Sequence, residues 1–235
     1  MSRSLKQFVA LAFVLAGVFA ALGFWQVARL GQRRARNAQV LARLRDPVTP
    51  MERLADTLSY RRAIALGTPD YANEIVLTGR SRDGSPGVYL LTPVRPMDSD
   101  TAALVIRGWV YSPDAATIDV SRWRETRNSF AGYVARIPDG PLIRAGERPR
   151  SIRRLTMSAV RELVPYPVAR MYLMSQDAAA DTAPARLPAP ALDEGSHLNY
   201  AITWFSFAAI AIIGAGTIVA QARLSPESTR QTQVD

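Results

Sequence analysis

The chain has 235 residues, 48% of them hydrophobic, and a formal net charge of +9. It contains no cysteine, which excludes disulfide bonds, thiolate metal sites, iron–sulfur clusters and cysteine nucleophiles. Its basic residues are spread along the chain, so the charge does not predict nucleic-acid binding. Residues 30–195 are numerous enough for one domain with a hydrophobic core and too few for two ordinary domains.

The first apolar segment, Phe8 to Val27, has no charged residue and the length of roughly 20 residues that crosses a bilayer. A cleaved signal peptide is the alternative, but its apolar stretch usually covers only about 7 to 15 residues. We therefore predict a transmembrane helix over 8–27.

A helical continuation is expected from Val27 to Arg45, because this stretch lacks proline and is rich in Ala, Leu, Gln and Arg. Thr49 and Glu52, with Pro50 between them, have the form of a capping box. That pattern predicts a second, short helix to about Leu58.

The pattern then becomes strand-like, with short aliphatic and aromatic runs separated by turn signals. Asp83-Gly84 lies between two runs and predicts a hairpin. Short, closely spaced strands favour an antiparallel sheet or small barrel. We predict a β-rich extramembrane domain over 28–175, with a helix near 158–164 and strands near 60–66, 74–80, 87–94, 103–111, 129–137 and 169–174.

The segment 176–195 is rich in Ala, Pro and Asp and predicts a loose tether back to the membrane. Tyr200 to Ala220 is again uncharged and of spanning length, which predicts a transmembrane helix over 200–220. The expected fold is therefore an α+β membrane protein, in which two transmembrane helices flank an antiparallel β-rich domain with short helices.

Two crossings place both termini on one side of the membrane and the middle domain on the other. They also bring the end of the first helix and the start of the second to the same membrane face. Charge leaves the orientation open: Arg3 and Lys6 precede the first helix and several arginines follow it. Long loops, moreover, translocate largely regardless of charge.

The only histidine, His197, lies at the mouth of the second helix. Tyr200, Ala201 and Trp204 follow it at i+3, i+4 and i+7, so all four share one helix face. A neutral imidazole is a good ligand for haem iron. The alternative, which the residues alone favour, is an aromatic belt at the membrane interface.

Trp25, Gln26 and Arg29 end the first helix at the same depth as His197. Trp25 and Arg29 share a face, and the guanidinium can pair with an anionic group such as a haem propionate. The alternative is that Arg29 extends to lipid phosphate.

Within the middle domain, Arg107 interrupts an apolar run, so it either faces water or is paired when buried. The adjacent Gly108 marks a bulge or a close backbone approach. No catalytic constellation, Walker A segment or dinucleotide fingerprint is present, and a Ser–His–Asp triad would need His197. The sequence does not predict an enzyme.

Four blocks occur in order along the chain: GFWQVAR at 23–29, a run ending in Leu91-Thr92-Pro93, VIRGWV at 105–110 and HLNYAITWF at 197–205. With the two-span layout, they cover almost the full length. Together they resemble the surfeit locus protein one family, which are assembly factors for cytochrome c oxidase (Shy-one in yeast).

The resemblance implies an assembly factor for a haem–copper cytochrome c oxidase, which assists haem A insertion into, or stabilisation of, the core catalytic subunit. The alternative is a cofactor-free membrane scaffold or accessory subunit that docks on the oxidase. The implied partners are the oxidase core subunit, membrane lipid and haem A synthase, with no nucleic acid. The resemblance also implies that the middle domain lies outside the cytoplasm, in a bacterial periplasm or a mitochondrial intermembrane space. The arginine-rich composition favours a bacterium, and so an inner membrane with both termini cytoplasmic and the middle domain periplasmic.

If the protein handles haem A transiently, the resemblance assigns roles at the two helix ends. His197 ligates the iron, Tyr200 and Trp204 pack on the macrocycle, and Arg29 with Gln26 contacts the propionates. Trp25 completes this expected cofactor-binding set.

Overall fold

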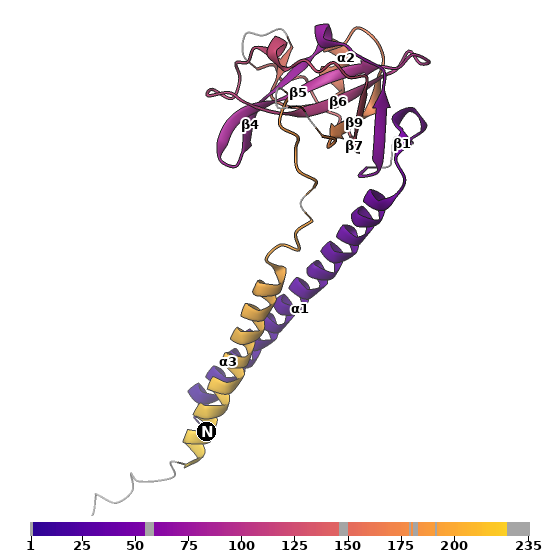
Figure 1. Cartoon of the computed structure of the whole chain (residues 1–235). Helices are drawn as coiled ribbons and strands as arrows, with labels where there is room; N and C mark the ends of the chain where they lie inside the picture. Colours follow the sequence, from indigo (N-terminus) through magenta and orange to yellow (C-terminus); the bar gives the residue numbers. More distant parts are fainter. Residues whose placement is uncertain are drawn as a thin grey trace, which may run out of the picture. The chain divides into compact units, whose positions relative to one another are not determined.

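The computed structural model describes residues 2–54, 59–145, 150–178, 180, 183–190 and 192–224 (Figure 1). The chain divides into two compact units. One joins Met1–Ala38 with Leu192–Asp235, and the other is Gln39–Ala191. The predicted domain boundaries at 28–175 and 176–195 stay predictions.

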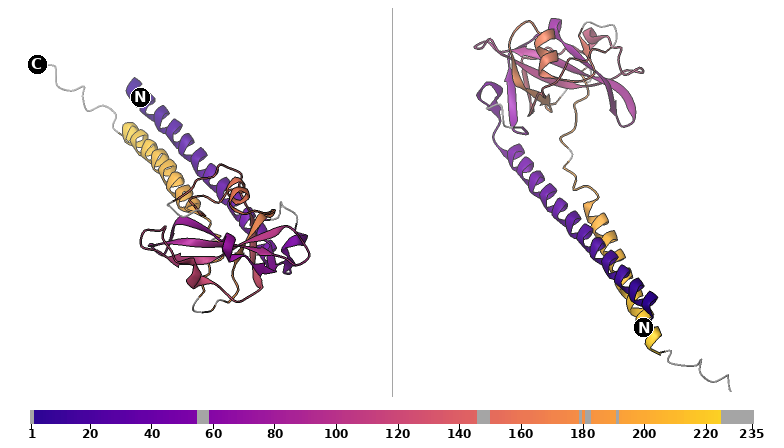
Figure 2. Two further views of the ribbon diagram at one scale, coloured as in Figure 1. Left: turned by 90° about the horizontal axis from the view of Figure 1, so that it is seen from above. Right: turned by 180° about the vertical axis from the view of Figure 1, so that it is seen from behind.

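The first unit is a pair of helices, α1 (Arg3–Arg45) and α3 (His197–Leu224), both long and apolar enough to cross a membrane. They run side by side in opposite directions (Figure 2). On each helix, three of the buried positions are spaced seven residues apart, which is the spacing that keeps one face of a helix against its partner. These positions are Ala16, Gly23 and Leu30 on α1 and Ala201, Ala208 and Ala215 on α3.

Small residues at this contact let aromatic rings fill the space between the helices. Phe19 stacks on Trp204 with 5.8 Å between ring centroids. On the other flank, Phe205 packs edge-on against Phe24 at 5.2 Å. A Cβ on Gly23 would lie 2.7 Å from the Phe205 ring, so a larger residue there would displace this ring.

The second unit is built on strands, as the alternating apolar runs predict. In chain order it contains β1 (Thr49–Pro50), η1 (Met51–Arg53), β2 (Arg62–Leu66), β3 (Thr68–Pro69), η2 (Tyr71–Asn73), β4 (Ile75–Arg82), β5 (Ser85–Arg95), β6 (Ala102–Tyr111), η3 (Val120–Trp123), β7 (Ser129–Arg136), β8 (Ser151–Ile152), α2 (Met157–Leu163) and β9 (Val168–Ser175). The predicted fold class, two long helices flanking a β-rich domain with short helices, is confirmed.

The strands form a mixed sheet in the order β1-β2-β7-β9-β6-β5-β4-β8. Most neighbours are antiparallel, but β1–β2, β6–β9 and β4–β8 are parallel. After Gly67, the chain of β2 continues as β3, which pairs with β5, whereas β2 itself pairs with β7. The paired strands therefore form a ring, and the domain contains a small barrel.

Alternation along the strands gives the sheet two apolar faces. Ala103 and Val105 point into the cluster enclosed by the ring, together with Phe130 and Val134 of β7. Leu104 and Ile106 lie on the opposite face, which α2 covers with Ala159, Val160 and Leu163. Helix α2 begins at a capping threonine, because the Thr156 hydroxyl accepts from the amide of Ala159.

Two local predictions have different outcomes. The Asp83-Gly84 hairpin is confirmed: both residues have positive φ, 50° and 81°, as a type I′ turn between β4 and β5 requires. The capping box at Thr49 is wrong. Its side chain donates to the carbonyl of Pro47, and only the 3-10 turn η1 follows, with no side-chain cap. The rest of the predicted helix, 55–58, lies outside the described residues.

Part of the segment predicted as a loose tether is docked on the β domain. The amides and carbonyls of Trp109 and Ala185 exchange two hydrogen bonds of 2.8 and 2.9 Å. Ala183 and Leu187 are buried beside this bridge. The apolar residues among the prolines explain the docking, since they bury surface that a solvated linker would expose.

Candidate cofactor site on the paired helices

The candidate site begins with a contact between the two helices. The Nδ1 atom of His197, at the first turn of α3, lies 2.8 Å from the amide oxygen Oε1 of Gln26 on α1. Gln26 is only 9% exposed, because it occupies the seam between Gly23 and Leu30. The antiparallel pairing thus brings together two predicted site residues that are 171 positions apart.

The opposite edge of the imidazole faces Gly195. This glycine has φ of +67°, a left-handed conformation that suits glycine in the turn before α3. A Cβ built on it would lie 3.7 Å from His197 Nε2 and 3.5 Å from Cδ2. Within the described part of the chain, Nε2 makes no hydrogen bond. The ring therefore presents Nε2 beside a residue that has no side chain.

The remaining predicted residues of α3 have different surroundings. Ala201 is 2% exposed and faces α1, whereas Tyr200 is 54% exposed. Trp204 is half-buried and stacks on Phe19. The four residues of the predicted face thus differ in their surroundings: Ala201 packs against α1, whereas Tyr200 is exposed.

On α1, Trp25 is 54% exposed, and the guanidinium carbon of Arg29 lies 6.0 Å from the centroid of its ring. Arg29 also donates to the side chain of Gln32 at 3.0 Å. Among the described residues, no carboxylate lies within ion-pair distance of Arg29. Its charge is consequently available to an anion. Gln26, by contrast, is hydrogen-bonded to His197 rather than placed with Arg29.

A polar clasp holds the segment before α3. It is formed by Arg33, Arg34 and Asn37 of α1 with Asp193 and Glu194. Arg33 pairs with Asp193 at 2.9 Å, and Arg34 binds both oxygens of Glu194 at 2.8 Å. Asn37 donates to the carbonyls of Leu192 and Asp193. The bonds from Arg34 hold the pKa of the Glu194 carboxyl below its usual value.

Sequence reasoning missed this clasp, although a signal was present. Two adjacent arginines follow the first apolar segment, and two adjacent acids precede the second. Because the two crossings bring these places to one membrane face, the opposite charges can pair there. The clasp fixes where α3 begins, and so helps to place His197 beside Gln26.

A second polar cluster lies inside the β domain. Arg107 is fully buried and donates to Glu74 at 2.5 Å, to Glu125 at 3.0 Å and to the Thr92 hydroxyl at 2.7 Å. Arg186, from the docked segment, binds the other oxygen of Glu125 at 2.5 Å. Burial raises the pKa of Glu125, but the bonds from Arg186 and Arg107 outweigh it and leave the pKa lowered. Of the two predicted states of Arg107, the structure shows the buried and paired one.

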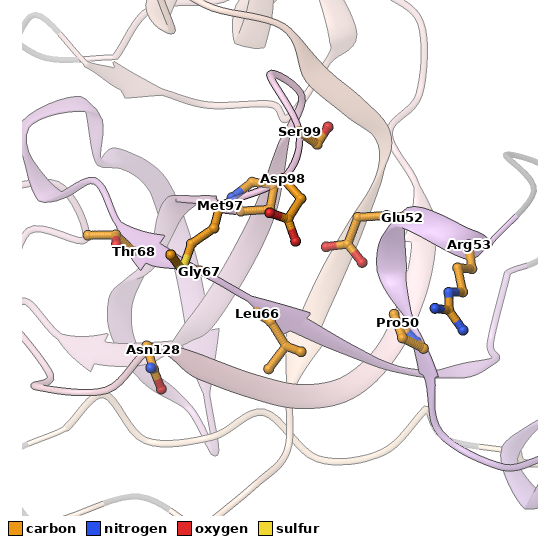
Figure 3. A pocket seen from close by; sticks show the side chains of 11 residues that line it. Pro50, Glu52, Arg53, Leu66, Gly67, Thr68, Met97, Asp98, Ser99 and Asn128 are labelled. Atoms are coloured by element: carbon orange, nitrogen blue, oxygen red, sulfur yellow. The ribbon is translucent and has the colours of Figure 1, made fainter.

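The β domain also has a surface groove of about 630 Å³, lined by residues such as Glu52, Leu66, Met97 and Asp98 (Figure 3). It contains none of the predicted site residues. Among the described residues, no three His, Cys, Asp or Glu side chains are grouped closely enough to hold a metal ion.

These features define a class of protein in which two paired helices of membrane length are joined by a small β-barrel domain, with the only histidine of the chain at the contact between the helices. The model of the SURF1 family matches residues 13–209. The chain therefore belongs to the SURF1 family, which confirms the resemblance carried by the four blocks.

Curated relatives agree with this assignment. A SURF1-like protein of Rickettsia conorii is 24% identical over 211 residues, covering 86% of this chain and 87% of the relative. One from Rickettsia bellii is 25% identical over 201 residues, covering 82% of each. One from Rickettsia felis reaches 33% identity over a shorter stretch of 94 residues, 39% of this chain and 41% of the relative.

Proposed function

We propose that this protein is an assembly factor for a haem–copper cytochrome c oxidase and that it handles haem A as transient cargo for the core catalytic subunit. Family membership supports the oxidase-assembly role. The haem role rests on one observation: the only imidazole of the chain has one nitrogen bound to Gln26 and the other beside the bare Gly195.

The residues at the helix ends fit a haem. His197 would ligate the iron through Nε2, which is the nitrogen that Gln26 leaves unbound. Arg29 would hold a propionate, since a guanidinium binds carboxylates well and here has no acidic partner among the described residues. Tyr200, Trp204 and Trp25 would pack against the macrocycle. Bound haem A would supply the redox-active iron destined for the oxidase.

The proposal includes a location and partners. The two helices would cross a bacterial inner membrane, with both termini cytoplasmic and the β domain periplasmic. Membrane lipid would surround α3 and the apolar part of α1, over 8–27, where large hydrophobic side chains such as Phe13 and Ile210 are exposed. The oxidase core subunit would receive the haem, and haem A synthase would supply it. No enzymatic step is assigned to this chain.

To test the haem role, the full chain is purified in detergent from a strain that makes haem A, and its optical spectrum is recorded. We expect a Soret band at near-stoichiometric intensity in the wild type. His197→Ala should lower this intensity at least tenfold, because a haem held without its axial ligand dissociates during purification. Asn199→Ala is the matched control, since Asn199 is exposed on the same turn of α3.

A clean wild-type preparation without a Soret band would contradict the haem role. If, in addition, His197→Ala leaves the haem content of the assembled oxidase unchanged, the chain acts as a cofactor-free scaffold or accessory subunit that docks on the oxidase.

A further inference from the structure

The hydrogen bond between Gln26 and His197 determines more than the position of the ring. A neutral imidazole has one protonated nitrogen, which donates, and one with a free lone pair, which accepts. The amide oxygen of glutamine is only an acceptor. The atom 2.8 Å from His197 Nδ1 is this oxygen, so the contact is a hydrogen bond only when Nδ1 carries the proton. The lone pair then belongs to Nε2, on the edge of the ring beside Gly195.

The surroundings of Gln26 hold this arrangement in place. The side chain is 9% exposed, between the buried positions Gly23 and Leu30. On α3, the small Ala201 is 2% exposed, as is common for residues at closely packed helix contacts. In such a site, an imidazole N–H without an acceptor would carry the cost of an unsatisfied buried donor.

We infer that Gln26 is a positioning residue: it selects the Nδ1-protonated tautomer of His197 and thereby leaves Nε2 as the ligand atom. The inference rests on the proposed haem role and specifies its atoms. Metal-binding histidines generally donate their second ring nitrogen to an acceptor, which fixes the tautomer and raises the basicity of the ligand. Here that acceptor comes from the partner helix, so the ligand atom is prepared only when α1 and α3 are paired.

The first test reads the tautomer without haem. Because the chain contains one histidine, isotopically labelled histidine reports His197 alone, provided the affinity tag contains none. Nitrogen NMR shifts are measured on the haem-free protein in detergent at about pH 8.5, roughly two units above the ordinary histidine pKa of about 6.5. We expect Nδ1 to be protonated and Nε2 to be unprotonated in the wild type.

Two variants separate the hydrogen bond from the volume of the side chain. Gln26→Glu keeps an acceptor at the same length and should keep the tautomer. Gln26→Met is similar in length but lacks a strong acceptor, and should give a mixture with Nε2 protonated. Gln39→Met is the control for the substitution itself, because Gln39 is exposed on the same helix.

The second test titrates haem into the same proteins and follows the Soret band. Loss of a partner that orients a metal-binding histidine lowers metal affinity about 10–100-fold, so Gln26→Met should weaken haem binding by that factor. Gln26→Glu and Gln39→Met should bind haem as the wild type does.

The outcomes distinguish this inference from the proposed function. Protonation of Nε2 in the wild type, as when the amide nitrogen faces the ring, overturns the inference. An unchanged tautomer in Gln26→Met also overturns it. If the tautomers follow expectation and no form binds haem, the assignment of Gln26 to the tautomer holds and the haem cargo is wrong.

Discussion

The guanidinium of Arg107 is fully buried, yet it faces two carboxylates, a hydroxyl and the ring of Tyr71 at 5.0 Å. Taking one cation and two anions out of water is costly, and mutual pairing offsets that cost only while every member is present. Arg186 supplies the second cation that balances Glu125. The network is therefore a structural element of the domain.

Arg107→Met should lower the free energy of unfolding by about 3–5 kcal/mol, because Glu74 and Glu125 would stay buried without their shared cation. The measurement is denaturant unfolding of the full chain in detergent, followed by a signal from the β domain. Arg122→Met is the control: that side chain is 79% exposed, and its loss should change stability by no more than about 0.5 kcal/mol. Equal stability of the two variants would contradict the assigned role.

The destabilisation caused by Arg107→Met should depend on pH. The pKa of Glu125 is lower in the folded state than its usual value, so its pairing stabilises the fold above the ordinary carboxyl range. That contribution is lost as pH falls through the depressed pKa. The difference in stability between wild type and Arg107→Met should therefore narrow in acid.

The sequence could predict that Arg107 is either exposed or paired, but not which residues pair with it. Glu74 and Glu125 are 33 and 18 positions away, and Glu125 lies outside any strand or helix, where no periodicity marks a direction. Gln26 shows the same limit. Two crossings predicted its depth, but its rotation toward His197 depends on which helix face is packed.

Elements with a repeating pattern were found from sequence almost to the residue. The predicted strand at 103–111 is β6, Ala102–Tyr111, and the predicted helix at 158–164 is α2, Met157–Leu163. The short strands β1, β3 and β8 have two residues each, too few to show alternation. The parallel pairing of β6 with β9 joins segments that are distant in sequence, so no hairpin signal could predict it.

The docking of 183–187 on β6 depends on a single backbone position. Gly108 has φ of +156°, and a Cβ there would lie 2.5 Å from the carbonyl oxygen of Ala185. The register of β5 against β6 shifts at this point, which opens the strand to the incoming segment. The docked segment therefore requires glycine at 108.

Gly108→Ala should detach this segment while the ring of strands persists. Trp109 and Ala185 would lose two hydrogen bonds of about 1 kcal/mol each, so amide exchange there should accelerate at least about tenfold. Hydrogen-exchange mass spectrometry of peptides covering 105–110 and 183–187 measures this. Gly140→Ala is the control: its φ is +154°, but its Cβ would meet only the Thr156 side chain. Equal acceleration in both variants would mean that backbone strain, rather than lost docking, is responsible.

At the scale of the whole molecule, the sequence predicted two membrane-length helices and a β-rich domain because each has a strong compositional signal. The orientation in the membrane had no such signal. The structure shows one reason why a count of basic residues does not predict it: two of the arginines after the first apolar segment, Arg33 and Arg34, are paired with Asp193 and Glu194. The local charge after the first apolar segment is thus smaller than a count of arginines suggests.

The proposed topology can be tested with single cysteines, because the natural chain has none. Met97 is 95% exposed on the β domain, and Ser2 is exposed before α1. In intact cells with a permeable outer membrane, a membrane-impermeant maleimide should label Met97→Cys and leave Ser2→Cys unlabelled until the inner membrane is disrupted. The reverse pattern would place the β domain in the cytoplasm, away from the proposed route of haem.

Because two crossings fix both termini on one side, a cysteine appended after Asp235 should behave as Ser2→Cys does. Labelling of that cysteine in intact cells would mean that α3 does not span the membrane.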